Sequence, residues 1–366
     1  MEDFVVSARK YRPKGFDEVV GQSHITTTLV NAIQNKQLAQ AMLFCGPRGV
    51  GKTTCARIVA RMINGFEETG QNTLNIFELD AASNNSVEDI RNLIDQVRYP
   101  PQQGTHKVYI IDEVHMLSNQ AFNAFLKTLE EPPSYAIFIL ATTEKHKVIP
   151  TILSRCQIYD FNRIQISDIS SHLKRIADTE EIKAEEEALH LIAQKSDGAL
   201  RDALSLFDLL VTFSSDRNIT YQSAIENLHV LDYDYYFKLT DLLLNSNVSG
   251  ALLLFDEILQ KGFDGHNFIV GLNSHFRDLM VSKDSSTIKL LEVPDAAKIK
   301  YQEQSSLTSS SFLLSAMNIT LQCDINYKGS KNQRLLVELT LCKLAHIGDA
   351  INLAKSLEGN GIKKKS

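Results

Sequence analysis

The eight residues from Gly46 to Thr53 constrain this chain more than any others, because they follow the pattern G-x-x-x-x-G-K-[ST]. In this pattern glycines let backbone N–H groups wrap phosphates, the lysine reaches the outer phosphates and the hydroxyl binds Mg²⁺. The apolar run Ala41–Cys45 precedes the motif as a buried strand, and Thr53–Ile63 follows it as a helix. We therefore predict a phosphate cradle formed by Gly46, Pro47, Arg48, Gly49, Val50, Gly51, Lys52, Thr53 and Thr54.

Short apolar runs alternate with helical patterns through the first part of the chain. Further strands are predicted at Ile76–Leu79, Val108–Ile111 and Ala136–Ala141, and helices near 24–36, from Ser86 onward and over Ser118–Glu130. Ser86 and Asp89 have the spacing of a capping box. Strands of this kind, alternating with helices, indicate a parallel α/β sheet with helices on both faces.

The alternation stops near residue 163, and the remaining sequence has almost entirely helical patterns. Helices are predicted near 167–179, 185–196, 200–213, 220–228, 234–245, 248–261, 266–281, 287–304, 308–325 and 331–357. At 366 residues the chain is long enough for two or three domains. We predict three: an α/β domain over 1–163, a small helical domain over 164–228 and a helical domain over 229–366.

Charge and cysteine content narrow the possible partners and compartment. The 38 basic and 44 acidic side chains give a net charge of −6, which argues against a protein that coats DNA or an anionic membrane. Residues 164–228 hold 6 basic and 12 acidic side chains, so the whole net negative charge of the chain lies in this region. The five cysteines are widely spaced, which predicts neither a disulfide framework nor a zinc site and fits a reduced cytoplasmic location. No apolar stretch is long enough to span a membrane.

Two carboxylates, Asp112 and Glu113, end the predicted strand that begins at Val108. At the carboxyl end of a parallel sheet they face the ligand crevice. We expect Asp112 to hold Mg²⁺ and Glu113 to polarise the attacking water as a general base. His115 lies close by, and we interpret it as a loop hydrogen-bonding residue without a catalytic role.

The cradle and the acidic pair together predict a P-loop protein that hydrolyses ATP or GTP. Three classes compete at this point: a small-molecule kinase, a helicase or other motor, and an oligomeric ATP-driven switch. A kinase is normally compact and lacks two further helical domains.

Further motifs are found at 9–13 (RKYRP), 19–22 (VVGQ), 112–118 (DEVHMLS), 126–133 (LKTLEEPP), 141–143 (ATT), 154–156 (SRC) and 198–204 (GALRDAL). Together they resemble the gamma/tau family of bacterial clamp-loader subunits, which are AAA+ ATPases of DNA polymerase III. The motifs are dense over residues 8–213, and beyond 230 the likeness lies in helical pattern and size. The fold it implies is an AAA+ domain, then a small all-α lid and an all-α collar domain.

The resemblance also assigns roles within the nucleotide site. Thr143 falls at the sensor 1 position, where a hydroxyl detects the γ-phosphate, and Arg201 falls at the sensor 2 position on the lid. Arg155 falls at the arginine-finger position, from which it acts in trans on ATP bound by a neighbouring subunit. The residues expected to border the adenine and ribose are Tyr11, Arg12 and Val20.

Contact with DNA is expected at the start of the helix that follows Ser86. Asn84, Asn85 and Ser86 offer hydrogen-bond donors and Arg91 a positive charge for backbone phosphates. Plain N-capping of that helix explains Ser86 equally well. DNA would therefore be met by a few donors repeated around an assembled ring.

The sequence departs from the family in two respects. Family members commonly carry a four-cysteine zinc module between the P-loop helix and the next strand, whereas Asn64–Asn75 contains no cysteine, so no zinc is expected. The chain also ends at 366 after Lys363–Lys365, which we interpret as a solvated tail. Regions by which the long form of the family binds the helicase and the polymerase are therefore not expected in this chain.

The resemblance implies the ATP-driving subunit of the bacterial replicative clamp loader. With ATP and Mg²⁺ as cofactors, and other clamp-loader subunits as partners in a ring or spiral, it would open the sliding clamp and load it on primed DNA. Nucleotidyltransferase activity would belong to the holoenzyme and not to a site in this chain. The alternatives are another AAA+ motor, such as a branch-migration helicase, and a non-catalytic scaffold subunit of a clamp loader. A scaffold subunit would typically have a damaged P-loop, and this one is intact.

Overall fold

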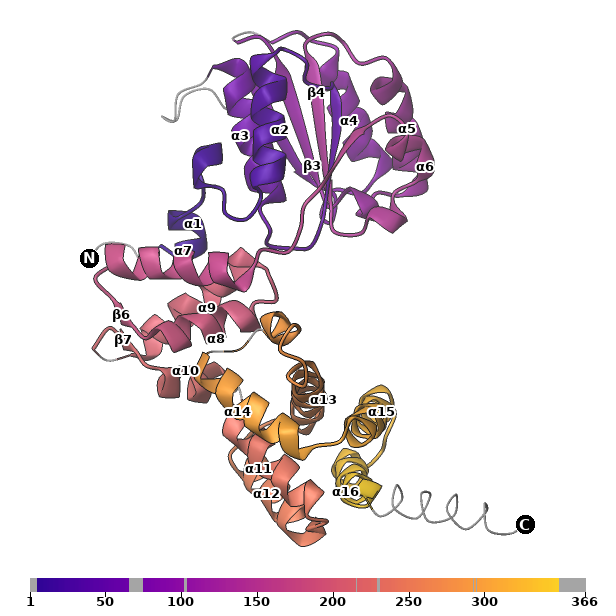
Figure 1. Ribbon diagram of the computed structural model, residues 1–366. Coiled ribbons are helices and arrows are strands. Elements are labelled where there is room, and N and C mark those ends of the chain that lie inside the picture. The colour runs from indigo at the N-terminus through magenta and orange to yellow at the C-terminus, as the bar shows by residue number, and fades with distance from the viewer. Residues whose placement is uncertain are drawn as a thin grey trace. The chain divides into compact units, whose positions relative to one another are not determined.

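The computed structural model describes residues 5–65, 75–101, 104–214, 216–228, 231–291, 293 and 295–348 (Figure 1). The chain divides into two compact units, Met1–Ile219 and Thr220–Ser366. Most of the segment expected to lack zinc, the boundary near 229 and the lysine-rich end lie outside the described residues. The division into three domains stays a prediction.

The first unit contains a five-stranded parallel sheet in the order β2-β3-β4-β1-β5. Its strands are β1 (Ala41–Cys45), β2 (Ile76–Asp80), β3 (Lys107–Asp112), β4 (Ala136–Thr142) and β5 (Gln157–Asp160). The four predicted strands are confirmed, and β5 was not predicted. β5 is an edge strand with only two apolar residues, Ile158 and Tyr159, so it has no continuous apolar run.

Helices cover both faces of this sheet (Figure 1). The helices of the domain are α2 (Ser23–Gln34), α3 (Lys52–Asn64), α4 (Val87–Val97), α5 (Asn119–Glu130) and the short α6 (Pro150–Leu153). On one face Met42 and Phe44 of β1 pack with Leu29 of α2 and Val59 of α3. On the other face Leu43 of β1 belongs to a separate core with α4 and α5. Successive β1 side chains thus point to opposite cores, as a strand buried on both faces requires.

Three helices follow the sheet within the first unit: α7 (Ile166–Thr179), α8 (Glu186–Lys195) and α9 (Leu200–Phe213). They confirm the helices predicted near 167–179, 185–196 and 200–213. A small parallel pair, β6 (Lys183–Ala184) and β7 (Asn218–Ile219), and the N-terminal helix α1 (Ser7–Lys10) were not predicted. Elements this short carry no periodic signal in the sequence.

The second unit is helical through its described residues and has one core of its own. Its helices are α10 (Tyr221–Leu228), α11 (Tyr233–Leu244), α12 (Val248–Gln260), α13 (Gly265–Val281), α14 (Asp295–Leu307), α15 (Ser310–Tyr327) and α16 (Gln333–Ala345). The single helix predicted over 287–304 is wrong. Instead, a short 3₁₀ turn (Ile288–Leu290) is followed by α14. The sequence has Pro294 just before α14, and a proline ring disfavours the helical conformation in the residue that precedes it.

Among the described residues, none of the helices is both long and apolar enough to cross a membrane.

Candidate nucleotide-binding site

The predicted phosphate cradle connects β1 to α3, at the edge of the sheet where the parallel strands end. Gly46 has φ 148° and Gly49 has φ 76°, in the region that favours glycine. A Cβ at Gly46 would lie 2.4 Å from the carbonyl oxygen of Phe161, and one at Gly49 would lie 3.0 Å from the Cβ of Ala199. The loop therefore needs glycine at both positions to follow its path between the sheet and α9.

Lys52 is the first residue of α3, and its side chain is buried at the centre of the loop. Its Nζ donates to the carbonyl oxygens of Gly46 at 2.7 Å and Pro47 at 2.8 Å. Burial lowers the pKa of Lys52, and the carboxylates of Glu113 and Asp112 partly oppose that shift. The ammonium is thus held by neutral acceptors that an anion can replace.

The acidic pair lies where predicted, at the end of β3 beside the cradle. The Thr53 hydroxyl donates to Oδ2 of Asp112 at 2.6 Å, so two oxygen groups suited to Mg²⁺ are adjacent. Glu113 follows with φ 48°, an uncommon conformation for a residue other than glycine. This turn directs the two carboxylates differently, and both line the same pocket.

Thr143 follows the end of β4 and contacts the second carboxylate of the pair. Oε2 of Glu113 accepts from the backbone N–H of Thr143 at 3.2 Å and from its hydroxyl at 2.9 Å. The sequence places these residues thirty positions apart, and adjacent parallel strands bring them together. Glu113 and the predicted sensor residue therefore form one hydrogen-bonded group.

His115, to which the sequence analysis gave no catalytic role, belongs to the same group, and its side chain is largely enclosed. Its Nδ1 lies 3.0 Å from the Thr142 hydroxyl and 3.4 Å from Oε2 of Glu113. Its Nε2 lies 3.0 Å from Oε2 of Glu144. His115 therefore has the hydrogen-bonding role expected of it. The fold adds that its ring lies next to the Glu113 carboxylate, which the sequence did not predict.

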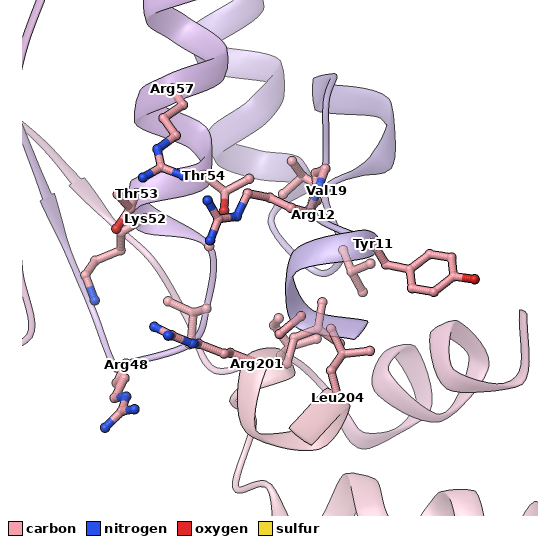
Figure 2. A pocket seen from close by; sticks show the side chains of 18 of the residues that line it. Tyr11, Arg12, Val19, Arg48, Lys52, Thr53, Thr54, Arg57, Arg201 and Leu204 are labelled. Atoms are coloured by element: carbon pink, nitrogen blue, oxygen red, sulfur yellow. The ribbon is translucent and has the colours of Figure 1, made fainter. Parts of the chain in front are cut away.

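Asp112 and Glu113 line a cavity of about 460 Å³ together with much of the cradle (Figure 2). Thr143 and His115 are not among its lining residues and reach it only through Glu113. Of the predicted cradle, the residues from Arg48 to Thr54 line the cavity, while Gly46 and Pro47 contribute through Lys52. Tyr11, Arg12 and Val20, which are predicted to border the adenine and ribose, also line it, and Arg201 lines it from α9. Lining residues that the sequence analysis missed are Ala8, Pro13, Val19, Arg57, Asp80, Ile164, Leu200 and Leu204. They come from segments far apart in the chain. Pro13, Val19, Leu200 and Leu204 lie within the motif stretches 9–13, 19–22 and 198–204, whereas no motif marks the other four.

Tyr11 lies at the cavity wall but its ring does not point toward the phosphate loop (Figure 2). Its hydroxyl instead donates to Glu180, at the end of α7. Arg12 extends between α1 and α3, with its guanidinium near Thr54 (Figure 2).

Arg155 lies apart from the residues that line the cavity. It follows α6, and Nη1 donates to the Thr151 carbonyl at 2.7 Å while Nη2 pairs with Glu130. The guanidinium is therefore placed on the surface beside the end of α5. Burial raises the pKa of the neighbouring Cys156 thiol to about 12, so this cysteine is protonated at neutral pH.

The residues predicted to meet DNA lie at the start of α4. Ser86 and Asp89 form a complete capping box, as predicted, and the Ser86 hydroxyl also donates to Asp89 at 2.6 Å. Asn84 donates to the carbonyl of Asp80, whereas Asn85 and Arg91 are exposed. The structure thus accounts for Ser86 by capping, and contact with DNA stays a prediction.

A glycine-rich loop after a central buried strand, an acidic pair on the next strand but one and a helical lid beside the pocket define the AAA+ class of P-loop protein. A solved structure of a mutant RuvB from Thermotoga maritima has the same fold, with a TM-score of 0.50 and 22% identity. The match covers 64% of this chain and 80% of that one.

Family models match almost the whole chain in three consecutive segments. They are the DNA polymerase III delta subunit over 21–165, the clamp loader subunit ATPase lid domain over 168–216, and domain III of subunits gamma and tau over 221–359. DNA polymerase III subunit gamma of Buchnera aphidicola is 32% identical over 94% of this chain and 98% of its own length. The chain belongs to the gamma/tau family of DNA polymerase III subunits.

Longer relatives extend beyond the matched region. DNA polymerase III subunit tau of Bacillus subtilis is 40% identical over 92% of this chain. The match covers 62% of that protein's length. The chain thus spans less than two thirds of this relative.

Proposed function

We propose that this chain binds and hydrolyses ATP as a catalytic, rather than a scaffold, subunit of a replicative clamp loader. The observation that carries the proposal is the convergence of Lys52, Thr53, Asp112 and Glu113 on one cavity of an AAA+ fold. A scaffold subunit would not need an intact set of these four groups. Membership in the gamma/tau family supports the choice of clamp loading over other uses of the fold.

The chain's own contacts fit a nucleotide with Mg²⁺. Lys52 exchanges the carbonyls of Gly46 and Pro47 for the outer phosphates, which are stronger acceptors for an ammonium. Thr53 and Asp112, now bonded to each other, supply the hydroxyl and carboxylate for the metal. When bound, Mg²⁺ neutralises phosphate charge. The N-terminus of α3 adds its positive dipole end.

Glu113 acts as the general base for the attacking water. In the structure one of its oxygens is occupied by the two Thr143 donors, which fix the direction of the carboxylate. A carboxylate oriented in this way can accept the water's proton without first searching for its position. Thr143 would respond to the γ-phosphate through this bond to Glu113.

Two arginines provide further positive charge from different sources. Arg201 lines the cavity from α9 of the same chain and ties lid position to phosphate binding. Arg155 lies outside the cavity and pairs with Glu130 of its own chain, an arrangement that suits action on a neighbour's ATP. Its release from Glu130 would accompany assembly of the subunits.

At the level of the assembly, ATP binding would order this chain and its partner subunits into a ring or spiral that holds the sliding clamp open at primed DNA. The α/β domain would bind ATP, the lid would sense the bound phosphates, and the helical collar over 229–366 would join the subunits. Asn84, Asn85, Ser86 and Arg91 would meet the DNA backbone, and the location would be cytoplasmic. Hydrolysis would then release the clamp.

The decisive experiment mixes this chain with the other subunits of its clamp loader, the clamp and primed circular DNA. We expect clamps retained on DNA only when ATP is present, and none with Lys52→Ala. Equal loading by Lys52→Ala would indicate a scaffold role. Branch migration driven by this chain without clamp retention would indicate the alternative motor.

A further inference from the structure

The N-terminal segment Ser7–Arg12 is fastened to the lid by two carboxylates. Asp208 of α9 accepts from the backbone N–H of Ser7 at 2.7 Å and from the Ser7 hydroxyl. Glu180, just after α7, accepts from both Lys10 and Tyr11 through the same oxygen. Every one of these contacts joins residues about 170 to 200 positions apart in the chain.

The same short segment forms part of the wall of the nucleotide cavity. Ala8, Tyr11 and Arg12 all line it. Figure 2 shows Arg12 extending toward α3 while the Tyr11 ring points away from the phosphate loop. One side of the segment thus faces the cavity and the other side holds the lid.

Helix α9 connects the two ends of this arrangement. Arg201 and Leu204 line the cavity, and Asp208 lies on the same face one turn further along, at a spacing of three and then four residues. The backbone N–H of Arg201 also donates to the carbonyl of Gly49 in the phosphate loop at 3.4 Å. A single helix therefore contacts the phosphate loop at its start and the N-terminal segment near its middle.

The hydrogen bonds to Asp208 and Glu180 favour one fixed position of Ser7–Arg12 on the lid. Hydrogen bonds from Lys10 and then Tyr11 lower the pKa of the Glu180 carboxyl, so it is ionised at neutral pH. Ser7 is buried, so both of its donors depend on Asp208 for partners. Charge-assisted hydrogen bonds of this kind are stronger than neutral ones.

We propose that Glu180 and Asp208 are positioning residues of the nucleotide site, which hold Ser7–Arg12 as a wall for ATP without touching it. This inference rests on the proposed ATP-binding function. Its consequence is that nucleotide affinity and the position of the lid depend on each other through the N-terminal segment. Movement of α9 by way of Arg201 would move this wall with it.

The test compares Glu180→Ala, Asp208→Ala and the double variant with Glu187→Ala, an exposed lid carboxylate that loses the same charge. Binding of a fluorescent ATP analogue and steady-state hydrolysis are measured on the full chain. We expect the dissociation constant and KM to rise roughly tenfold in the double variant, because the wall formed by Ser7–Arg12 loses both carboxylates that hold it in place. We expect kcat at saturating ATP to stay unchanged, because binding alone is altered.

A charge exchange keeps the inference falsifiable if an alanine variant is unstable. Lys10→Glu and Glu180→Lys should each weaken nucleotide binding, and the double exchange should restore most of it. Unchanged affinity in Glu180→Ala and Asp208→Ala, with normal binding by the unaltered chain, would overturn the inference. Absence of ATP binding by the unaltered chain would instead overturn the proposed function.

Discussion

The nucleotide cavity of the first unit and the core of the second unit both contain buried polar groups, but these groups are used differently. Buried Lys52 donates to loop carbonyls and half-buried Thr53 donates to Asp112, and all three side chains line the cavity. His275 in α13 is fully enclosed, with Nδ1 3.0 Å from the Tyr301 hydroxyl and Nε2 3.2 Å from the side-chain oxygen of Gln304. The first set has partners that a ligand can replace, and the second set has none to give up.

The same contrast extends to the next layer of contacts in the second unit. The Gln304 amide donates to the Phe237 carbonyl and to Asp241, both at 2.8 Å. His275, Tyr301 and Gln304 thus form a continuous buried network with an ordered set of donors and acceptors. Buried networks of this kind specify one packing arrangement, whereas exchangeable partners prepare a binding site.

The largest effect is expected from Lys52→Ala, which removes the replaceable ammonium. ATP binding should be abolished. The thermal unfolding midpoint without nucleotide should be retained, because the variant loses the contacts of Lys52 but also the cost of burying its charge. Titration calorimetry and a melting scan measure the two results. Lys331→Ala, at an exposed lysine, is the control. Normal ATP affinity would show that the contacts of Lys52 are structural, like those of His275, and do not prepare a binding site.

Arg155→Ala should reduce hydrolysis in the assembled complex by on the order of a thousandfold, the effect of losing an arginine finger. ATP affinity of the isolated chain should not change, since Arg155 does not line the cavity. Steady-state turnover with and without partner subunits measures this, with Arg98→Ala as the control. Full turnover in the complex would remove Arg155 from action in trans.

Glu113→Gln should slow hydrolysis by roughly a hundredfold, because the amide cannot accept the proton from water. ATP should still bind, because Lys52, Thr53 and Asp112 are intact. Single-turnover hydrolysis and equilibrium binding measure the two properties separately. An unchanged rate would show that the Thr143-bound carboxylate is structural, like the groups around His275.

His275 should make the stability of the second unit depend on pH. Burial lowers its pKa to about 3, so the folded state keeps it neutral while the unfolded chain binds a proton below about pH 6.5. The free energy of unfolding should therefore fall as pH drops from 6.5 toward 3, by up to about 1.4 kcal/mol per pH unit for this proton. Hydrogen exchange of α13 measures the change.

His275→Phe is the matching variant for that measurement. It should lower stability at pH 7, because Tyr301 and Gln304 lose a partner, and it should flatten the pH dependence. If the variant keeps the full dependence, other groups in the second unit are responsible. ATP binding by the first unit should be unaffected by either change.

The smallest effect is expected from Ser86→Ala, which removes the N-cap of α4 and should destabilise the α/β domain by about 1 kcal/mol. Ser83→Ala, whose hydroxyl lies 3.5 Å from Asp80, is the control. Chemical unfolding measures stability, and retention on primed DNA measures the predicted contact. Loss of DNA retention beyond the loss of stability would give Ser86 a second role.

The sequence was most informative where a function is built from consecutive residues. The strand Ala41–Cys45 was predicted with its correct bounds, and the cradle and acidic pair follow their strands as expected. β5 escaped because pairing with β1, rather than an apolar run of its own, makes it a strand. The helix predicted over 287–304 is wrong because Pro294 falls inside that range, and a proline disfavours helix at the residue before it.

By itself, then, the sequence determined the phosphate loop, the acidic pair and the alternating α/β pattern, because these depend on residues that are neighbours in the chain. Only the tertiary structure decided that Thr143 and His115 surround Glu113, and that Tyr11 turns toward Glu180. Those contacts depend on which strands pair and how α9 packs against the N-terminal segment. Such packing joins residues far apart in sequence, so no local pattern encodes it.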